Sequence, residues 1–491
     1  MNLRKLVGQT AIYGLSSIMG RVLNYLLTPL YTYTFSTGEY GVLSEFYAYA
    51  GFISIVLVMG LETGFFRYHA REGYSGNQVY ATAVGTLFIV CVAFVGSIVV
   101  WQQPLALWIH HETHTEYLVW FALILTLDTL TALPLARLRA QNRAWRFAVI
   151  KLLEIATGLL LNLYFLLYLP NHPLTWTEAS LSLAYDPAVG VGYIFLANLV
   201  ASLFRTLILL PEFRISIKEI QTRVLVALLR YSLPMIVIGA AGMVNEMLDR
   251  AILKYLLPYD SATNLQQLGI YAACYKLAML MTLFVQAFRY AGEPFFFAQA
   301  RRTDAPILYA RVMRYFVLFG IFIFLVVTLY LDGFQYFIGE SYRQGLSVVP
   351  VLLIANLLLG IHVNLSVWYK LTDKTFMGAW VAVLGAMITI VLNIELIPIW
   401  GYQGSAWATL ICYAVMVLIS GWLSRRYYPV PYPVGAILAY FGLGLGLFCI
   451  NSLPAYKHAL PFWGGSVLLL GFLATVAMFE IKPIRRVLLR F

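Results

Sequence analysis

Long apolar runs recur along the chain, separated by short polar or charged stretches. A helix needs about 20 mainly apolar residues to cross the hydrocarbon core of a bilayer. Barrel strands would instead alternate apolar and polar residues. The pattern therefore predicts about fourteen transmembrane helices, centred in 8–33, 38–66, 77–101, 116–136, 147–169, 189–211, 226–256, 268–297, 312–332, 346–369, 376–398, 402–424, 432–451 and 461–481.

Composition supports an all-α polytopic membrane protein. The 491 residues are 61% hydrophobic and 11% charged, whereas about a quarter of a soluble domain is charged. This composition excludes a soluble enzyme, a disordered chain and a fibrous one. Arg4 and Lys5 lead into a span of full length without a small-residue cleavage site, so no cleaved signal peptide is expected.

The basic residues predict the orientation of the spans. With the N-terminus inside, 23 of the 33 Lys and Arg lie in cytoplasmic segments, and only Lys254, Arg343 and Lys457 are assigned to outer loops. Cytoplasmic loops carry this excess in membrane proteins, so both termini are predicted to be cytoplasmic. The net charge of +11 then reflects topology, and nucleic acid is not an expected partner.

An internal repeat indicates two related halves. A shift of 228 residues pairs Gly41 with Gly269 and Tyr47 with Tyr275. The repeat unit is six spans, which predicts two pseudo-symmetric six-helix lobes with the substrate path between them. The expected division is an N-terminal lobe over 1–212, a C-terminal lobe over 213–425, and spans thirteen and fourteen with a basic cytoplasmic tail over 426–491.

Seven basic residues fall inside predicted spans, where a central charge needs a partner or a wet cavity. Arg205 and Arg230 lie near inner ends and are expected to extend toward the interface. Two cations have an acid on the same helix face and are expected to form ion pairs. These pairs are Lys151 with Glu154 and Arg289 with Glu293.

Arg21 lies near the middle of the first span, with Asn24 one turn away, and Asp128 lies at similar depth in span four. We interpret Arg21 as lining a polar central cavity; the alternative is a structural Arg21–Asp128 bridge. Span seven also carries polar residues. Lys276 of span eight lies at a depth comparable to that of Asp249, so we predict a contact between Asp249 and Lys276. Toward its outer half, span seven carries Asn245, Glu246, Asp249 and Arg250.

A cationic cavity at this depth suits an anionic substrate, because the planar guanidinium matches phosphate. Intramembrane acids often carry coupling ions. The candidate substrate-binding residues are Arg21, Asn24, Lys276, Arg289 and Arg250, and the candidate coupling residues are Asp128, Glu246 and Asp249. Coupling to H⁺ or Na⁺ is possible, and no cofactor is expected.

Sequence motifs give no sign of enzymatic chemistry. No GxxxxGK[ST], HExxH or GxSxG motif occurs. The HHETH stretch at 110–114 is interpreted as a solvated outer loop; a surface metal site is the alternative. No metal site is predicted.

Several stretches resemble the polysaccharide-transporter (Wzx-type, O-antigen and capsule flippase) family. They are YSLPMIVIGAAGMVNEMLDRAIL at 231–253, LGIYAACYKLAMLMTLFVQAFRYAGEPFF at 268–296 and LNIELIPIWGYQGSAWATLICYAVM at 392–416. In combination, the most specific positions are Pro234, Asp249-Arg250, Gly269-Ile270-Tyr271 and Pro294.

The resemblance implies a member of the multidrug/oligosaccharidyl-lipid/polysaccharide (MOP) exporter superfamily. Such a protein moves a polyprenyl-diphosphate-linked oligosaccharide across the bacterial inner membrane by alternating access, for cell-surface polysaccharide biosynthesis. Related lipid II flippases are thought to hold the diphosphate with cavity arginines, and Arg21, Lys276 and Arg289 are the matching positions. Span two carries Glu45 and Glu62 where those flippases tend to have a basic residue, which argues against a lipid II role.

Other functions stay open at this point. A MATE-like cation-coupled small-molecule antiporter would share the architecture, and so would a lipid II (MurJ-type) flippase. A membrane scaffold or polymerase is disfavoured because the outer loops are short. Expected partners are the lipid-linked oligosaccharide and membrane lipids, with a polysaccharide polymerase and glycosyltransferases as possible protein partners. Spans thirteen and fourteen are expected either to form a groove for the polyprenyl tail or to serve packing alone.

Overall fold

The structure is a computed structural model that describes residues 18–69, 71, 73–171, 186–300, 302–372, 374–460 and 463–488. Within these ranges the regular elements are helices, and no strand occurs. The chain divides into two compact units, Met1–Ala272 with Ala382–Ser405, and Ala273–Val381 with Ala406–Phe491. The lobes expected from the internal repeat are defined by sequence symmetry, not by compactness, and stay a prediction.

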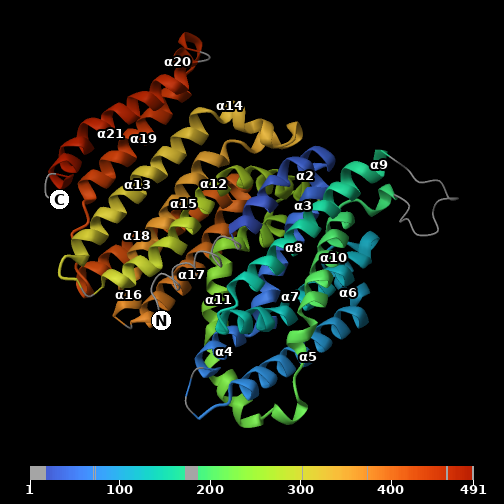
Figure 1. The fold of residues 1–491 in the computed structure, drawn as a ribbon. Helices are drawn as coiled ribbons and strands as arrows, with labels where there is room; N and C mark the ends of the chain where they lie inside the picture. Colours follow the sequence, from blue (N-terminus) through green and yellow to red (C-terminus); the bar gives the residue numbers. More distant parts are fainter. Residues whose placement is uncertain are drawn as a thin grey trace. The chain divides into compact units, whose positions relative to one another are not determined.

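The first unit is a bundle of long helices that begins with a helical stretch over 18–26 (Figure 1). Its elements are α2 (Thr28–Thr34), α3 (Thr37–Val58), α4 (Leu61–His69), α5 (Gly76–Val100), α6 (Gln102–Trp108), η1 (Glu112–His114), α7 (Thr115–Ala140), α8 (Ala144–Leu163), η2 (Tyr164–Tyr168), α9 (Leu169–Asn171), η3 (Pro187–Val189), α10 (Gly192–Leu209), η4 (Leu210–Phe213), η5 (Ile217–Glu219) and α11 (Thr222–Leu256), with parts of α12 (Ser261–Gln299) and α17 (Thr375–Trp400).

The second unit holds the rest of α12 and α17 and most of α18. Its other elements are α13 (Ala305–Leu329), α14 (Leu331–Phe334), η6 (Gln335–Phe337), η7 (Glu340–Gly345), α15 (Val348–Leu365), α16 (Val367–Leu371), α18 (Tyr402–Tyr427), α19 (Val434–Ser452), α20 (Pro454–Ala459) and α21 (Gly464–Leu488). Helices α13, α19 and α21 run side by side (Figure 1). Arg314 of α13 pairs with Glu480 of α21 at 2.5 Å and donates to the Tyr440 hydroxyl of α19 at 3.2 Å.

The expected membrane spans are confirmed for most of the chain. In the described residues, twelve helices are long and apolar enough to cross a membrane, and Gly464–Glu480 is a shorter apolar helix. These thirteen match the second to the fourteenth predicted spans. The first part of the first predicted span, over 8–17, lies outside the described residues. The chain is therefore an all-α, multi-pass membrane protein.

Local sequence signals explain the ends of α3. Its start is a capping box, in which the Glu39 backbone donates to Ser36 Oγ at 3.3 Å and the Ser36 backbone donates to Glu39 Oε2 at 2.9 Å. Its end is set by Met59 and Gly60, both with positive φ, which no helix interior tolerates. The chain then resumes as α4, so one membrane span is built from two helical pieces.

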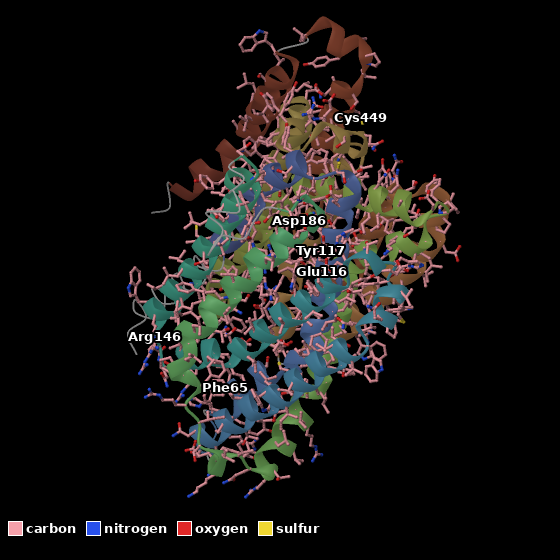
Figure 2. All side chains as sticks on the ribbon, turned by 90° about the vertical axis from the view of Figure 1, so that its right-hand side faces the viewer. Phe65, Glu116, Tyr117, Arg146, Asp186 and Cys449 are labelled. Carbon is pink, nitrogen blue, oxygen red and sulfur yellow. The ribbon has the colours of Figure 1, made fainter. Side chains whose placement is uncertain are left out.

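Residues predicted on opposite sides of the membrane lie toward opposite ends of the first unit. Figure 2 shows Phe65 and Arg146 toward one end, and Glu116, Tyr117 and Asp186 toward the other. At that second end the Tyr117 hydroxyl donates to the Val189 carbonyl at 2.6 Å. The separation agrees with the alternation of the spans, and which end faces the cytoplasm stays a prediction.

Two glycines that the internal repeat aligns meet at a close helix contact. A Cβ atom on Gly41 of α3 would lie 2.0 Å from the Leu265 carbonyl oxygen, and one on Gly269 of α12 would lie 1.9 Å from the Thr37 carbonyl oxygen. The opposing atoms belong to the backbone and have no rotamer with which to withdraw. The contact therefore requires glycine at both positions because only a residue without Cβ permits this approach.

Replacing Gly269 with Ala should force α3 and α12 apart and cost about 1–3 kcal/mol of stability. The midpoint of thermal unfolding in detergent measures the effect. Gly96→Ala in α5 is the matched control, since a Cβ there meets nothing within 4 Å and alanine favours the helix by about 1 kcal/mol. Equal midpoints for the two variants would contradict the close contact.

Candidate functional site

The first unit contains a polar cavity of about 390 Å³ between its helices. The stretch 18–26 contributes Arg21 and Asn24, and the other walls come from α3, α7, α8 and α10. The polar lining residues are Arg21, Asn24, Tyr47, Asp128, Lys151, Glu154, Asn162, Asn198 and Ser202, with Phe121 and Phe195 among the apolar ones. Helices that are apolar enough to span a membrane thus turn charged side chains toward one space.

A chain of alternating charges runs along one side of this cavity. Lys151 Nζ lies 3.0 Å from Glu154 Oε2, which confirms the predicted pair. Glu154 also binds Arg205 of α10, and Arg205 Nη2 lies 2.5 Å from Asp128 Oδ1. Ser202 Oγ donates to the same Asp128 oxygen at 2.7 Å. With two cations and two carboxylates, this row of four side chains has no net formal charge.

Arg205 was expected to extend toward the inner interface, and that expectation is wrong. Its side chain is 4% exposed and binds both Asp128 and Glu154. A buried guanidinium needs such partners because the charge costs too much free energy alone. One sequence signal could have indicated a buried polar site here: Ser202 and Arg205 are three residues apart and therefore lie on the same helix face.

Arg21 lies apart from the alternating chain. Its side chain is exposed at the cavity wall, and it forms no ion pair with any of the residues that the structure describes. The alternative of an Arg21–Asp128 bridge is not realised, since Asp128 pairs with Arg205 instead. When Arg205, which lies behind the cavity wall, is counted with Lys151, Glu154 and Asp128, these four charges cancel, and Arg21 adds one formal positive charge.

Amide and aromatic groups complete the cavity. Asn162 Oδ1 accepts from the Tyr31 hydroxyl at 2.9 Å, and its Nδ2 donates to the Gly158 carbonyl at 2.7 Å. Asn198 Nδ2 donates to the Tyr47 hydroxyl. These bonds hold the amides in place beside the Phe121 and Phe195 rings. Fixed amides and aromatic faces suit hydroxyl-rich ligands, which need both hydrogen bonds and apolar contact.

The candidates on α11 lie away from this cavity. Asp249 is buried, accepts from the Tyr271 hydroxyl at 2.6 Å and lies 3.4 Å from Arg250 Nε. Arg250 Nη2 donates to the Glu246 carbonyl at 2.9 Å, and the Glu246 side chain is exposed. None of these three residues lines the cavity. The structure gathers Arg21, Asn24 and Asp128 and leaves Glu246, Asp249 and Arg250 in a separate group.

Lys276 and Arg289 belong to the second unit. The Lys276 side chain is half-buried and that of Arg289 is exposed, while the Glu293 side chain lies outside the described residues. The roles of Lys276 and Arg289, their predicted pairings included, stay predictions.

A second buried charge cluster joins α3, α11 and the connection after α6. Glu45 is 0% exposed and accepts from Lys254 Nζ at 3.0 and 3.1 Å. His111 Nε2 lies 3.0 Å from the same carboxylate, and Lys254 also donates to the Ile109 carbonyl at 2.6 Å. The assignment of Lys254 to an outer loop is therefore wrong, because it is a buried residue of α11 that neutralises Glu45.

The expectation of a solvated HHETH loop is wrong for His111, which is buried against Glu45, although His110 is exposed. The alternative of a metal site gains no support either. In the ranges that the structure describes, no group of three or more His, Cys, Asp or Glu side chains is placed to hold a metal ion.

The chain also matches a known protein family. A family described as polysaccharide biosynthesis protein matches residues 6–297. The chain belongs to this family. The resemblance inferred from residues 231–253 and 268–296 is thereby confirmed. None of the curated proteins compared with the chain matches it at a significant level.

Several solved structures share the fold of this chain. Lipid II flippase MurJ in an inward closed conformation is 12% identical, with a TM-score of 0.69, covering 96% of this chain and 99% of that one. A MATE multidrug transporter of the MOP superfamily in an inward-facing conformation is 13% identical, with a TM-score of 0.65, covering 88% and 99%. A MATE transporter of that superfamily in an outward-facing conformation is 13% identical, with a TM-score of 0.60, covering 88% and 96%.

At these identities the likeness establishes the fold. The solved structures with this fold are those of a flippase and of multidrug transporters.

Proposed function

We propose that this protein is a flippase for a polyprenyl-diphosphate-linked oligosaccharide, acting in cell-surface polysaccharide biosynthesis. It moves its substrate across the bacterial inner membrane by alternating access, with both chain termini in the cytoplasm. The observation that carries the proposal is the cavity of the first unit, where Arg21 adds a cation to an otherwise neutral set of charges. Membership of the polysaccharide biosynthesis protein family supports the substrate class.

Each part of the substrate has a chemical counterpart in this cavity. The diphosphate is anionic and accepts charge-assisted hydrogen bonds, which Arg21 supplies with its planar set of donors. The sugars present hydroxyls, for which Asn24, Asn162 and Asn198 offer amide partners. The polyprenyl tail is as apolar as the bilayer and stays in it.

Asp128 is the coupling residue in this proposal. Its side chain is 47% exposed and shares Arg205 with Glu154, so a proton or Na⁺ reaching Asp128 from the cavity changes the charge of the whole alternating chain. Coupling through an intramembrane acid of this kind is common in transporters. Glu246 and Asp249 remain proposed coupling residues, and Lys276, Arg289 and Arg250 proposed ligands of the substrate. A polysaccharide polymerase and glycosyltransferases are the proposed protein partners.

Replacing Arg21 with Ala should lower export of the surface polysaccharide at least tenfold, because a lost charge-assisted contact to a phosphate costs about 1.5–3 kcal/mol. Surface polysaccharide is measured in the native host with the chromosomal copy replaced by the variant. Lipid-linked oligosaccharide should accumulate in the inner leaflet. Arg21→Lys keeps the charge and should retain part of the activity.

Arg302→Gln is the control, since it removes a surface cation whose partner, Asp304, lies two residues away. The Arg21→Ala, Arg21→Lys and Arg302→Gln variants must all reach wild-type abundance in the membrane. Normal export by the Arg21→Ala variant would refute the proposed role of Arg21. Efflux of cationic dyes by the wild type, without any binding of a diphosphate-linked lipid, would instead favour the MATE-like antiporter.

A further inference from the structure

A second polar cavity lies at one end of the first unit, apart from the proposed substrate site. It has a volume of about 240 Å³. The first turn of α5, the last turn of α7 and the segment around η5 form its walls. The polar lining residues are Asn77, Tyr80, Arg137, Arg214, Ser216 and Glu219. We refer to it as the Arg137–Arg214 pocket.

Cations outnumber carboxylates in and behind this pocket. Arg137 stacks on the Tyr80 ring at 4.5 Å, and its Nη1 donates to the Glu212 carbonyl at 3.4 Å. The Glu212 carboxylate lies 3.9 Å from Arg137 and is shared with two further arginines, Arg143 at 3.8 Å and Arg146 at 2.8 Å. One carboxylate thus faces three guanidinium groups and leaves an excess of positive charge.

Several donors of the pocket are open to a ligand. Arg214 is exposed at the pocket wall. In the part of the chain that the structure describes, it forms no ion pair, and the side chains of Asn77 and Ser216 form no hydrogen bonds. Glu219 is the acidic residue of the wall, so Arg137 and Arg214 together exceed its charge by one.

The start of α5 adds to the preference for an anion. Asn77 stands in the first turn of this 25-residue helix, which holds no acidic side chain, and the N-cap Ser75 makes no side-chain capping bond. The backbone N–H groups of that turn carry the positive end of the helix dipole. Guanidinium, hydroxyl and amide donors around one small cavity match the oxygens of a phosphate group.

The residues beside the pocket favour a lipid as the source of such a phosphate group. Ile217 follows Ser216 directly and is 83% exposed, and Ile220 is exposed as well. Lys218 lies between them. An exposed aliphatic side chain flanked by cations suits the boundary between headgroups and acyl chains. The volume of about 240 Å³ accommodates a headgroup, while the acyl chains remain outside beside Ile217.

We propose that the Arg137–Arg214 pocket binds the phosphate of an anionic membrane lipid. A lipid held there ties the connection between α10 and α11 to the start of α5, where the Gln221 backbone already donates to Thr82 Oγ1 at 3.1 Å. This site is separate from the proposed substrate cavity, so its ligand is a resident lipid and not the transported molecule.

The full-length protein in detergent is titrated with phosphatidylglycerol, and the bound lipid is counted by native mass spectrometry. Arg214→Gln should weaken binding about tenfold, because it removes a charge-assisted contact between the guanidinium group and the lipid phosphate. Lys218→Gln is the matched control. It also removes one positive charge, and Lys218 is only four residues from Arg214 but does not line the pocket. That variant should change binding less than twofold.

Three outcomes overturn the proposal. Equal losses for Arg214→Gln and Lys218→Gln would indicate diffuse attraction to an anionic surface. Equal binding of phosphatidylcholine, which has no net charge, would show that the anion is not recognised. Displacement of the lipid by millimolar inorganic phosphate would assign the pocket to a soluble phosphate. Export by the Arg214→Gln variant is measured separately, so a failure of this inference leaves the proposed function untouched.

Discussion

Replacing Lys254 with Met should destabilise the protein by about 3–5 kcal/mol, the usual cost of removing one partner of a buried ion pair. Lys254 and Glu45 are both almost fully buried, and their charged atoms lie 3.0 Å apart. Without Lys254, the Glu45 carboxylate keeps the Tyr49 hydroxyl and His111 Nε2 among its polar partners but loses the ammonium group that neutralises it. Denaturant unfolding in detergent measures the loss.

The double variant Lys254→Met, Glu45→Gln should recover much of this stability, because the amide is neutral and still accepts from Tyr49. Arg302→Gln is the control for an exposed pair, and it should cost less than about 1 kcal/mol. If Lys254→Met and Arg302→Gln unfold at the same denaturant concentration, the buried pair contributes nothing to stability. If the double variant is as unstable as the single one, the lost contact of Lys254 with the Ile109 carbonyl dominates instead.

Replacing Arg205 with Leu should lower stability by about 3 kcal/mol and abolish export. The change leaves Asp128 and Glu154 without their shared cation. Glu154 retains a second cation, Lys151, whereas Asp128 retains only the neutral Ser202 hydroxyl among the partners described above. Asp128 is 47% exposed to the cavity, so water offsets part of the cost, which should be smaller than that of Lys254→Met. Unfolding in detergent and surface polysaccharide in the host are measured on the same variant.

Lys151→Met serves as the comparison, because Lys151 is a member of the same charge chain but is 28% exposed and pairs with Glu154 alone. It should cost at most about 1 kcal/mol. Adding Asp128→Asn to Arg205→Leu should restore part of the stability without restoring export. Recovery of export in that double variant would contradict the coupling role proposed for Asp128.

The two charge clusters show why sequence reasoning placed some residues wrongly. Glu45 and Lys254 are 209 positions apart, and Arg205 and Asp128 are 77 apart. Depth along a span can be estimated from the apolar pattern, but a pairing depends on which faces of two distant helices meet. Only the Lys151–Glu154 pair, three positions apart on one helix, was within reach of helical spacing.

The sequence by itself determined that this is a multi-pass helical membrane protein, where its spans lie and to which family it belongs. The helical class and the spans follow from local composition, since each span needs enough apolar length and each backbone must satisfy its own hydrogen bonds in lipid. The family follows from the match of residues 6–297. The tertiary structure decided that Arg205 takes Asp128 and leaves Arg21 at the cavity wall, and that Lys254 neutralises Glu45. These pairings depend on how each helix is rotated and packed. The apolar pattern does not show that rotation, because most helices of this chain are hydrophobic on nearly every face.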